Sequence, residues 1–510
     1  MSKLAKNLVE SPVTEFYKGK TIFLTGSTGF LGKVFIEKIC RVCPDIQKIY
    51  VILRPKKGKT TKQRLDDMVD SPMFENLKKT NPNFIEKLSM IEGDCALPNL
   101  GISFTDQEKL VKEVDVVVHC AATTRFDEHL RTATYINVRA LHDLIQIAEK
   151  MEKLKAFIHV STAYSNCIRK DVGEICYKPT MSPGDLINIV DGMDNESLTA
   201  VTPILLKDHP NTYTFTKQVA EQCVEANKSK LPIAIFRPSI VISSYKEPMP
   251  GWIDNMFGPV SASVGVGVGV VRCLPAKRDN NLDIVPVDYV INSIISFVWD
   301  VATKYEDDKI NKNLGRELPI CNFVSSVESP LTQGDYISLA FKHFSKYPTL
   351  FSIWYATVIV CTTMTAYKFW AFFFHTIPAH LFDLILTCIG RKPMVVKGYT
   401  KIDKFMTTYA YFAYRQWNFK NDNVQRLWRN LTEKDKDTFP FSMKNFDWST
   451  YFDRLGLGGR IYLLKDPIET LDRAKKWFLF LKFMHYAVIT LFLYGFYKLC
   501  MSALSYLFVV

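Results

Sequence analysis

Six short apolar runs, each followed by a segment long enough for a helix, constrain the fold most strongly. Uninterrupted β-branched runs of this length are typical of strands that are buried on both faces of a parallel sheet. Because helical crossovers join parallel strands, the sequence predicts an α/β fold with a doubly wound parallel sheet. The runs are Thr21–Thr25, Lys48–Leu53, Leu88–Ile91, Asp115–His119, Ala156–Val160 and Pro232–Phe236.

The alternation ends near Leu318, and the rest of the chain has a different character. A chain of 510 residues also exceeds the ~250–300 residues of a single core. Later segments have helical patterns: Asp335–Phe344, Asn423–Asn430 and Pro467–Lys476. We therefore expect an N-terminal arm at 1–17, a catalytic α/β domain at 18–318, a smaller and mostly helical C-terminal domain at 319–476, and a separate tail at 477–510.

The tail has the composition of a transmembrane anchor. Phe483–Tyr497 carries no charge, and the whole tail is long enough for one tilted membrane helix. Basic residues flanking membrane helices favour the cytosolic side. They are more numerous before the uncharged stretch than after it, which predicts a cytosolic catalytic domain; a buried core helix is the alternative for the tail. The residues compared are Lys465, Arg473, Lys475 and Lys476 against Lys498.

A second apolar region lies at 349–386. Phe351–Tyr367 is uncharged, but its length only just reaches the ~17–25 residues that span a bilayer. Basic residues also lie on both sides of the region, so we expect a hairpin or a membrane-lying surface rather than a crossing. The predicted partner is a lipid bilayer. The charged start lacks a secretory signal. A C-terminal tail anchor suits the endoplasmic reticulum membrane, which we expect, with the peroxisomal membrane as the alternative.

Charge and cysteine content exclude other classes. The net charge is +12, but Lys and Arg are scattered and no nucleic-acid-binding module is recognisable, so no nucleic-acid partner is expected. Cys40 and Cys43 form one CxxC pair, which supplies half of a tetrahedral zinc site. No metal site is therefore expected.

A glycine-rich turn follows the first run and precedes a helical segment. In this context Gly26 permits the tight turn, Gly29 lets the backbone approach a pyrophosphate, and Gly32 allows close packing of helix on strand. The amides at the helix N-terminus would face the phosphates. The pattern predicts a dinucleotide site in a Rossmann fold, built from Gly26, Ser27, Thr28, Gly29, Phe30, Leu31 and Gly32.

The second run ends in Arg54 rather than in the carboxylate that would bind the ribose of NAD. A guanidinium offers a planar fork to a 2′-phosphate, which predicts NADPH, with Arg64 as a second cation. A solvated basic loop is the alternative. After the third run, Asp94, with Cys95 beside it, is placed to accept the adenine amino group, or else to cap a helix.

Tyr213 and Lys217 form a YxxxK motif. On a helix this spacing puts the phenol and the ammonium on one face, and the positive charge lowers the pKa of the phenol. Tyr213 would then protonate a carbonyl oxygen as a hydride reaches the carbon. Hydroxyls at Ser161 and Thr162 follow the fifth run and could share the developing oxyanion.

Together these residues resemble the extended short-chain dehydrogenase family over roughly residues 18–300. The resemblance implies that Thr162, with Ser161 beside it, Tyr213 and Lys217 take the family's catalytic roles. It further implies that Asn137 supports a proton relay. The segment after Arg237 would meet the nicotinamide carboxamide, and Ala121 also joins the cofactor-binding residues; that segment is Pro238, Ser239 and Ile240.

Later segments narrow the resemblance. The sequence GWIDN at 251–255 and the stretch 281–292, followed by a helical domain and an apolar tail, look like the alcohol-forming fatty acyl-CoA reductases. That family reduces a long-chain acyl-CoA to a primary alcohol and free CoA with two NADPH. Rival interpretations are a membrane-bound sterol or sugar-nucleotide enzyme of the same superfamily, an aldehyde-releasing acyl reductase, and a non-catalytic membrane scaffold.

Overall fold

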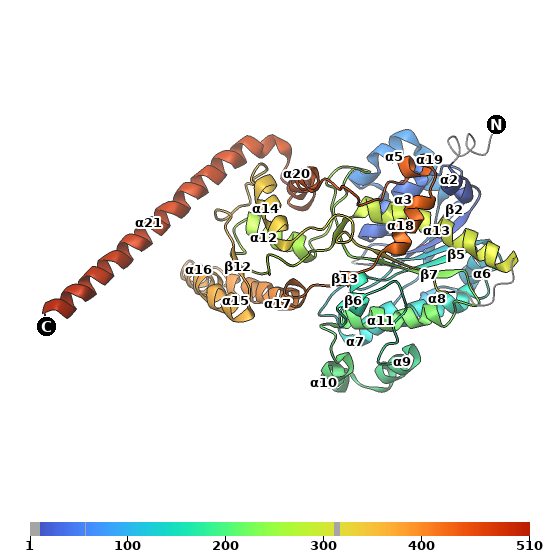
Figure 1. The fold of residues 1–510 in the computed structure, drawn as a ribbon, viewed down its shortest axis with the longest axis horizontal. Helices are drawn as coiled ribbons and strands as arrows, with labels where there is room; N and C mark the ends of the chain where they lie inside the picture. Colours follow the sequence, from blue (N-terminus) through green and yellow to red (C-terminus); the bar gives the residue numbers. More distant parts are fainter. Residues whose placement is uncertain (1–10, 57, 311–316, 510) are drawn as a thin grey trace. The chain divides into compact units, whose positions relative to one another are not determined.

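A computed structural model describes residues 11–56, 58–310 and 317–509, which fold into two compact units (Figure 1). The first unit consists of Met1–Pro250, Asn281–Leu331 and Gln416–Phe446, and the second of Gly251–Asn280, Thr332–Arg415 and Asp447–Val510. The units therefore interleave along the chain, whereas the domains expected from the sequence, 18–318 and 319–476, are contiguous.

A seven-stranded sheet forms the centre of the first unit, in the order β11-β7-β5-β4-β1-β2-β3. Every pairing is parallel, which confirms the doubly wound Rossmann sheet and all six predicted strands. The seventh strand, β11, lies beyond the point where we expected the alternation to end. The strands are β1 Thr21–Thr25, β2 Lys48–Leu53, β3 Leu88–Glu92, β4 Val116–His119, β5 Ala156–Val160, β7 Ile233–Pro238 and β11 Ile320–Phe323.

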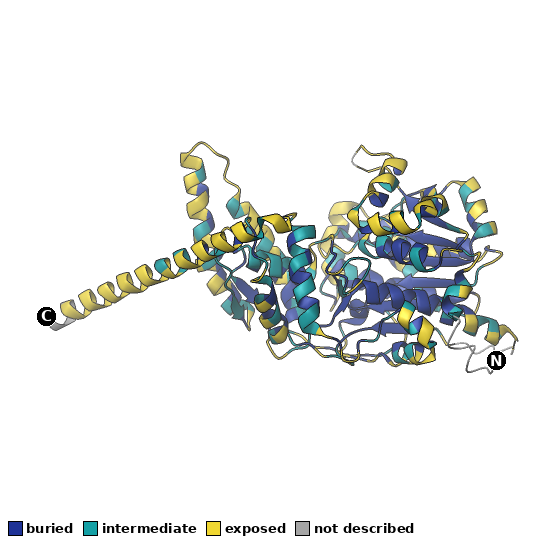
Figure 2. Ribbon diagram, turned by 90° about the horizontal axis from the view of Figure 1, so that it is seen from above, coloured by how far each residue is buried: buried dark blue, intermediate teal, exposed yellow. Residues whose placement is uncertain are grey.

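Helices cover both faces of this sheet, and Figure 2 shows its strands buried (dark blue). On one face α8 and α11 pack on Val117 and Phe157; on the other α3 and α13 pack together. The helices of this unit are α2 Pro12–Tyr17, α3 Phe30–Val42, α4 Thr61–Val69, α5 Glu75–Thr80, α6 Phe104–Glu113, α7 Leu130–Thr134, α8 Ala140–Ala148, α9 Pro183–Gly192, α10 Asn195–Leu206, α11 Thr212–Glu225, α13 Val287–Ile310, α18 Asp422–Asn430 and α19 Glu433–Thr438.

Shorter elements complete the first unit. Two parallel pairs, β8 with β10 and β6 with β13, lie outside the main sheet. A π-helical turn, η4 Tyr135–Arg139, joins α7 to α8. The remaining short elements are η1 Pro72–Phe74, η2 Pro82–Lys87, η3 Pro98–Gly101, η5 Ala163–Asn166, β6 Asp171–Val172, β8 Ile240–Ile242, β10 Ile284–Pro286 and β13 Asn418–Phe419.

The second unit is mostly helical, as the sequence predicts. Its only strands within the described residues are β9 and β12, which pair in parallel. Its elements are α12 Gly258–Gly267, β9 Cys273–Pro275, α14 Gln333–Phe344, β12 Ile359–Cys361, α15 Met364–Ala371, η6 Phe372–Thr376, α16 Ile377–Cys388, α17 Val395–Ala413, α20 Trp448–Gly458, η7 Gly459–Leu463, η8 Ile468–Thr470 and α21 Leu471–Val509.

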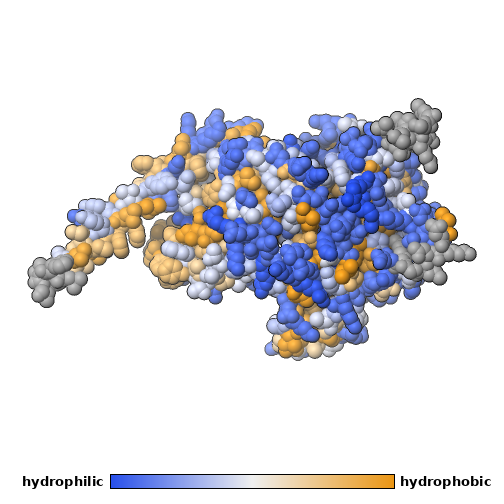
Figure 3. Space-filling model, in the orientation of Figure 1, coloured by the Kyte–Doolittle hydropathy of each residue, from blue (hydrophilic) through white to orange (hydrophobic). Residues whose placement is uncertain are grey.

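Two helices of the second unit are long and apolar enough to cross a membrane, by length and composition: Met364–Cys388 and Ile468–Ser505. Figure 3 shows apolar (orange) atoms along α21 and around α15 and α16. The uncharged run Phe351–Tyr367 is not one helix, because its first part is loop and β12, and α15 begins only at Met364.

Candidate active site

The glycine turn between β1 and α3 has the geometry that its sequence predicts. Gly26 has a φ of +73°, and a Cβ atom on it would lie 2.8 Å from the Ala121 nitrogen. A Cβ on Gly32 would lie 2.3 Å from the Gly26 oxygen. Only glycine fits these two positions, because a side chain would collide with backbone. The turn thus brings the start of α3 against the end of β4.

Several unsatisfied polar groups around the turn fit a dinucleotide. Gly29 caps α3 without a side-chain hydrogen bond, and the positive end of a helix attracts phosphate oxygens. Ser27 and Ser239 are buried, and neither hydroxyl has a hydrogen-bond partner within the described residues. Phe30 and Leu31, half-buried, form the first turn of α3.

Two guanidinium groups lie at the end of β2. Arg54 Nη1 donates to Asp94 Oδ2 at 2.7 Å, and Arg64 donates to the Arg54 carbonyl at 2.7 Å and to Thr28 Oγ1 at 3.0 Å. Burial, and then the positive charge of Arg54, lowers the pKa of Arg64. Arg64 therefore connects the basic strand end to the glycine turn, and an anion bound between the two cations would be stabilised.

The other predicted cofactor residues lie at the carboxyl ends of strands. Asp94 Oδ1 also accepts the Ala96 amide at 3.0 Å, a local turn rather than a helix cap, and Cys95 is half-buried against the core. Ala121 follows β4, and its amide donates to Thr25 Oγ1 at 3.1 Å. Pro238, Ser239 and Ile240 connect β7 to β8.

The YxxxK motif lies in the first two turns of α11, as its spacing predicts. Tyr213 is half-buried, and the Thr162 hydroxyl hydrogen-bonds its phenol. Thr162 Oγ1 also accepts the Tyr164 amide at 3.2 Å, so its own proton is free to point at the phenol oxygen. Burial raises the pKa of Tyr213 to about 12, with the Thr162 hydrogen bond opposing the rise. Tyr213 is therefore protonated at neutral pH.

Lys217 is buried beneath the end of β5. Its ammonium donates to the Val160 carbonyl at 2.8 Å, and burial lowers its pKa to about 8. In this structure burial and Thr162, rather than the Lys217 charge, account for the pKa of Tyr213. Lowering of the Tyr213 pKa by Lys217 stays a prediction.

Ser161 and Thr162 are adjacent but have different partners. Ser161 Oγ donates to Glu221 Oε1 at 2.6 Å, on the face of α11 that also carries Tyr213 and Lys217. Arg237 forms a buried ion pair with Glu221 at 2.6 Å. The structure thus brings Thr162 to Tyr213 and ties Ser161 to the Glu221–Arg237 pair.

Sequence reasoning missed this ion pair, although a signal was present. Tyr213, Lys217 and Glu221 are spaced by four residues, so they share one helix face. Arg237 directly precedes the predicted nicotinamide segment. Glu221 also accepts a hydrogen bond from Ser165 at 2.9 Å. The pair therefore connects α11, the end of β5 and the end of β7, which are the three elements that carry the candidate residues.

Asn137 lies in the π-helical turn η4 and is buried. Its Oδ1 accepts the Thr123 amide at 2.9 Å, and its Nδ2 donates to Thr216 Oγ1 at 3.0 Å. Thr216 is the neighbour of Lys217 on α11. A π turn inside a helix is frequent at functional sites, and here it holds Asn137 against the catalytic helix.

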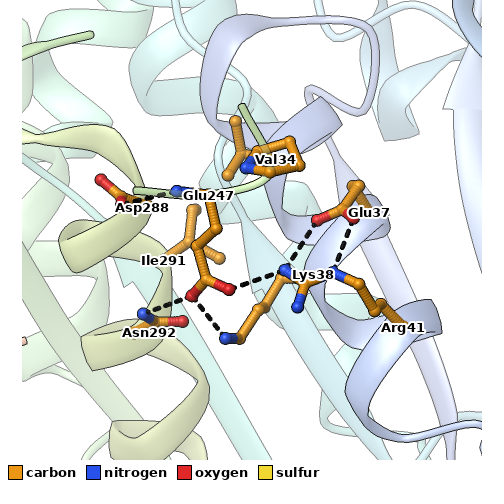
Figure 4. A pocket seen from close by; sticks show the side chains of 9 residues that line it. Val34, Glu37, Lys38, Arg41, Glu247, Asp288, Ile291 and Asn292 are labelled. Atoms are coloured by element: carbon orange, nitrogen blue, oxygen red, sulfur yellow. Dashed lines mark hydrogen bonds and ion pairs between the residues drawn. The ribbon is translucent and has the colours of Figure 1, made fainter. Parts of the chain in front are cut away.

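A small pocket behind α3 contains charged residues but is filled by their own interactions (Figure 4). Lys38 and Arg41 form ion pairs with Glu247 at 2.5 and 2.8 Å, and Asn292 of α13 donates to Glu247 at 3.1 Å. Nearby, Asp288 accepts the backbone amides of residues 245–247. This cluster fixes α3, which begins at the glycine turn, against α13.

The sheet, the glycine turn and the Tyr–Lys pair define a nicotinamide-dependent oxidoreductase of the short-chain dehydrogenase kind. Sequence comparison supports a more specific assignment. The family described as "Male sterility protein" matches at residues 24–294, and a second family of the same description matches at 374–466. The chain belongs to this family, and the relatives that match it at 36 to 40% identity show that it is a fatty acyl-CoA reductase family.

Individual relatives match over nearly the whole chain. The Drosophila melanogaster protein "Fatty acyl-CoA reductase wat" is 40% identical, covering 95% of this chain and 92% of that protein. "Fatty acyl-CoA reductase 1" of Mus musculus is 36% identical, covering 91% and 88%.

Solved structures share the fold. The terminal R domain of the myxalamid biosynthetic pathway has a TM-score of 0.54 at 18% identity, covering 87% of this chain and 91% of that one. The reductase domain of a Mycobacterium tuberculosis nonribosomal peptide synthetase has a TM-score of 0.54 at 17% identity, covering 91% and 97%.

Proposed function

We propose that this oxidoreductase reduces a long-chain fatty acyl-CoA to the primary alcohol and free CoA with two NADPH. The observation that carries the proposal is the arrangement of Tyr213, Thr162 and Lys217 around the end of β5, which β4 separates from β1 and its glycine turn. The names of the relatives supply the substrate class.

The residues support two rounds of the same proton transfer. When bound, the nicotinamide supplies a hydride to the acyl carbon. Tyr213 gives its proton to the carbonyl oxygen, and the Thr162 hydroxyl stabilises the charge on that oxygen. The product is a hemithioacetal. Its hydroxyl proton would return to the tyrosinate as the C–S bond breaks, which gives the aldehyde and the CoA thiolate and leaves Tyr213 protonated again. A second hydride and a second proton through Tyr213 give the alcohol.

Lys217 and Asn137 would support this proton transfer. The buried Lys217 ammonium would hold the nicotinamide ribose and favour the tyrosinate left after each transfer. Asn137 holds Thr216, beside Lys217, and would support the relay that returns a proton to Tyr213.

The proposed choice of NADPH depends on Arg54 and Arg64. Two adjacent guanidiniums repel one another, and a 2′-phosphate between them would relieve that repulsion through charge-assisted hydrogen bonds. An NAD-binding site has a carboxylate at the end of the second strand instead. Asp94 follows the neighbouring strand, β3, and already binds Arg54.

We also propose that α21 anchors the enzyme in the endoplasmic reticulum membrane with the catalytic unit in the cytosol. The most apolar stretch of α21 is exposed along its length, and basic residues are concentrated before it. Protease protection on intact microsomes tests the orientation. Co-localisation with peroxisomal markers instead would favour the alternative organelle.

The decisive experiment uses the purified full chain in phospholipid vesicles with NADPH and acyl-CoA of graded chain length, with products identified by mass spectrometry. We expect two NADPH oxidised for each alcohol and free CoA formed. One NADPH for each free aldehyde would contradict the four-electron reaction. No NADPH oxidation with any acyl-CoA would contradict the proposed substrate class.

A further inference from the structure

We propose that α15, η6 and α16 form a second membrane-binding surface, which lies in the interface of a bilayer containing anionic phospholipids. The surface is the outward face of residues 364–389. It is separate from the α21 anchor and does not depend on the proposed reaction.

The helix over 364–388 buries three polar residues against the second unit, whereas its exposed side chains are mainly large and apolar, with Lys368, Thr376 and His380 among them. Positions four residues apart face the protein and are buried, and three of the five carry polar groups: Tyr367, Ala371, His375, Ala379 and Asp383. A helix of a water-soluble protein has the opposite pattern, with its apolar stripe inward.

The inward polar groups are used by neighbouring elements. His375 Nε2 accepts the Arg272 amide at 2.9 Å, and its ring stacks on Tyr399 of α17. Asp383 accepts the amides of residues 394–396 at 2.8 to 3.0 Å and so caps the start of α17. These bonds hold the helix against α17 and β9.

Large apolar side chains cover the outward face. Phe369, Phe372, Phe373, Leu381, Phe382 and Ile385 are 47 to 59% exposed. A contiguous apolar face of this kind marks contact with lipid or with another protein. Figure 2 shows exposed (yellow) helix in this part of the second unit.

Charge favours lipid as the occupant. The loop after α16 and the exposed side of α17 carry Arg391, Lys392, Lys397, Lys401 and Lys404. Aromatic residues on one face with cations beside it are the pattern of interfacial helices that bind anionic bilayers. Among protein partners, only an acidic one would be attracted electrostatically to these five cations beside an apolar face.

The contacts of Asp383 favour an interfacial position over a crossing. A crossing helix would carry the start of α17, with the Lys397 and Lys401 side chains, into the hydrocarbon, because the Asp383 carboxylate is bonded to that start. A helix lying in the interface leaves both lysines in the headgroup layer.

Residues 352–363 interact with both apolar helices, α21 and α15. The Trp477 indole of α21 donates to the Ser352 carbonyl at 2.8 Å, and the Trp354 indole donates to His485 of α21 at 3.0 Å. Thr363, a few residues later, caps α15. An enzyme anchored through α21 therefore has α15 and α16 close to the bilayer.

Depth-dependent fluorescence quenching tests this surface in the full chain. In a background that lacks the two exposed cysteines, Cys388→Ser with Cys500→Ser, one added cysteine at a time replaces Phe369, Ile377 or Ile385 and carries an environment-sensitive fluorophore; the signal of the labelled background is subtracted. The protein is placed in vesicles of phosphatidylcholine and phosphatidylserine with brominated acyl chains. We expect quenching at all three positions, strongest with bromine near the headgroup. Lys401→Cys in the same background is the matched control and should be quenched several-fold less.

Any other outcome would contradict the proposed membrane-binding surface. Deep quenching confined to Ile377, the middle position, would show a crossing helix. Blue-shifted but unquenched emission with energy transfer between labelled copies would show a protein dimer. Emission typical of a fluorophore in water at all three labelled positions would show that this surface does not bind the bilayer. Lys397→Glu with Lys401→Glu should remove the increase in quenching that phosphatidylserine gives over phosphatidylcholine alone; an unchanged increase would exclude the anionic headgroup.

Discussion

Ser161 donates a 2.6 Å hydrogen bond to Glu221, while its neighbour Thr162 hydrogen-bonds Tyr213. Two adjacent hydroxyls at the end of β5 therefore have separate tasks. One joins the strand end to the buried Glu221–Arg237 pair, and the other reaches the candidate proton donor. This separation leads to opposite expectations for the two side chains.

Thr162→Val should lower kcat roughly 10²-fold, the cost of removing one donor to an oxyanion. Ser161→Ala should lower stability by about 1–3 kcal/mol, since it removes a donor from buried Glu221, and should change kcat much less. Steady-state kinetics and thermal unfolding of both variants check this. A larger kcat loss for Ser161→Ala would reverse the assignment.

Glu221→Gln should destabilise the first unit by about 3–5 kcal/mol, because it leaves the buried Arg237 guanidinium without a counter-charge. We expect a lower unfolding temperature together with a higher KM for NADPH, since Arg237 adjoins the proposed nicotinamide segment. Glu225→Gln, on the same helix but only partly buried, is the matched control. A stability close to that of the original protein would show that the pair is not required.

Tyr213→Phe should reduce turnover by roughly 10²–10⁴-fold, the usual contribution of a positioned acid. NADPH binding, followed by fluorescence, should persist because the ring is kept. Substantial residual turnover would show that another group donates the proton. Phe126, whose ring stacks on Tyr213 with centroids 6.1 Å apart, should tolerate Leu with a smaller loss.

The pH dependence should follow Lys217. Its pKa is about 8, so kcat/KM should fall as pH rises through about 8 and the ammonium is lost. Tyr213, with a pKa of about 12, stays protonated over this range. Lys217→Arg remains charged, so any activity that it retains should lose this fall. A fall at the same pH in Lys217→Arg would assign it to another group.

Lys217 should also affect stability in a defined direction. Burial lowers its pKa from 10.5 to about 8, so the unfolded chain binds this proton more tightly than the folded protein. The contribution of this group to the free energy of unfolding should therefore increase as pH rises from about 8 to about 10.5. Denaturant titrations of the original protein and Lys217→Met across this range measure the difference.

Arg54→Glu should weaken NADPH binding about 10–100-fold, which corresponds to ~1.5–3 kcal/mol for hydrogen bonds to a charged group. NADH binding should change little or improve, since a carboxylate binds the free ribose hydroxyl. Lys59→Glu, on the same loop with its ammonium on Asp67, is the matched control. Equal losses for both cofactors would exclude a 2′-phosphate contact at Arg54.

Strand prediction succeeded where the signal was local and failed at β11. Ile320–Phe323 is short and contains Asn322, which is polar and therefore atypical of a buried strand. The Asn322 Nδ2 atom donates to the Lys420 carbonyl at 2.9 Å, about a hundred residues away. No pattern within the strand indicates that partner.

The domain prediction differs from the observed units for a similar reason. Residues 416–446 return to the first unit, where the Trp417 indole donates to the Cys167 carbonyl at 2.9 Å and β13 pairs with β6. Such contacts between distant parts of the chain leave no periodic signal in the sequence.

The sequence alone determined the parallel sheet, the glycine turn and the shared face of Tyr213 and Lys217, because each depends on residues a few positions apart. Only the tertiary structure decided that Thr162 rather than Ser161 meets Tyr213, and that the polar stripe of α15 and α16 faces inward. These outcomes depend on partners far along the chain, such as Glu221 for Ser161 and the start of α17 for Asp383. Apolar content predicted contact with a membrane, whereas the direction in which that surface points is a property of packing.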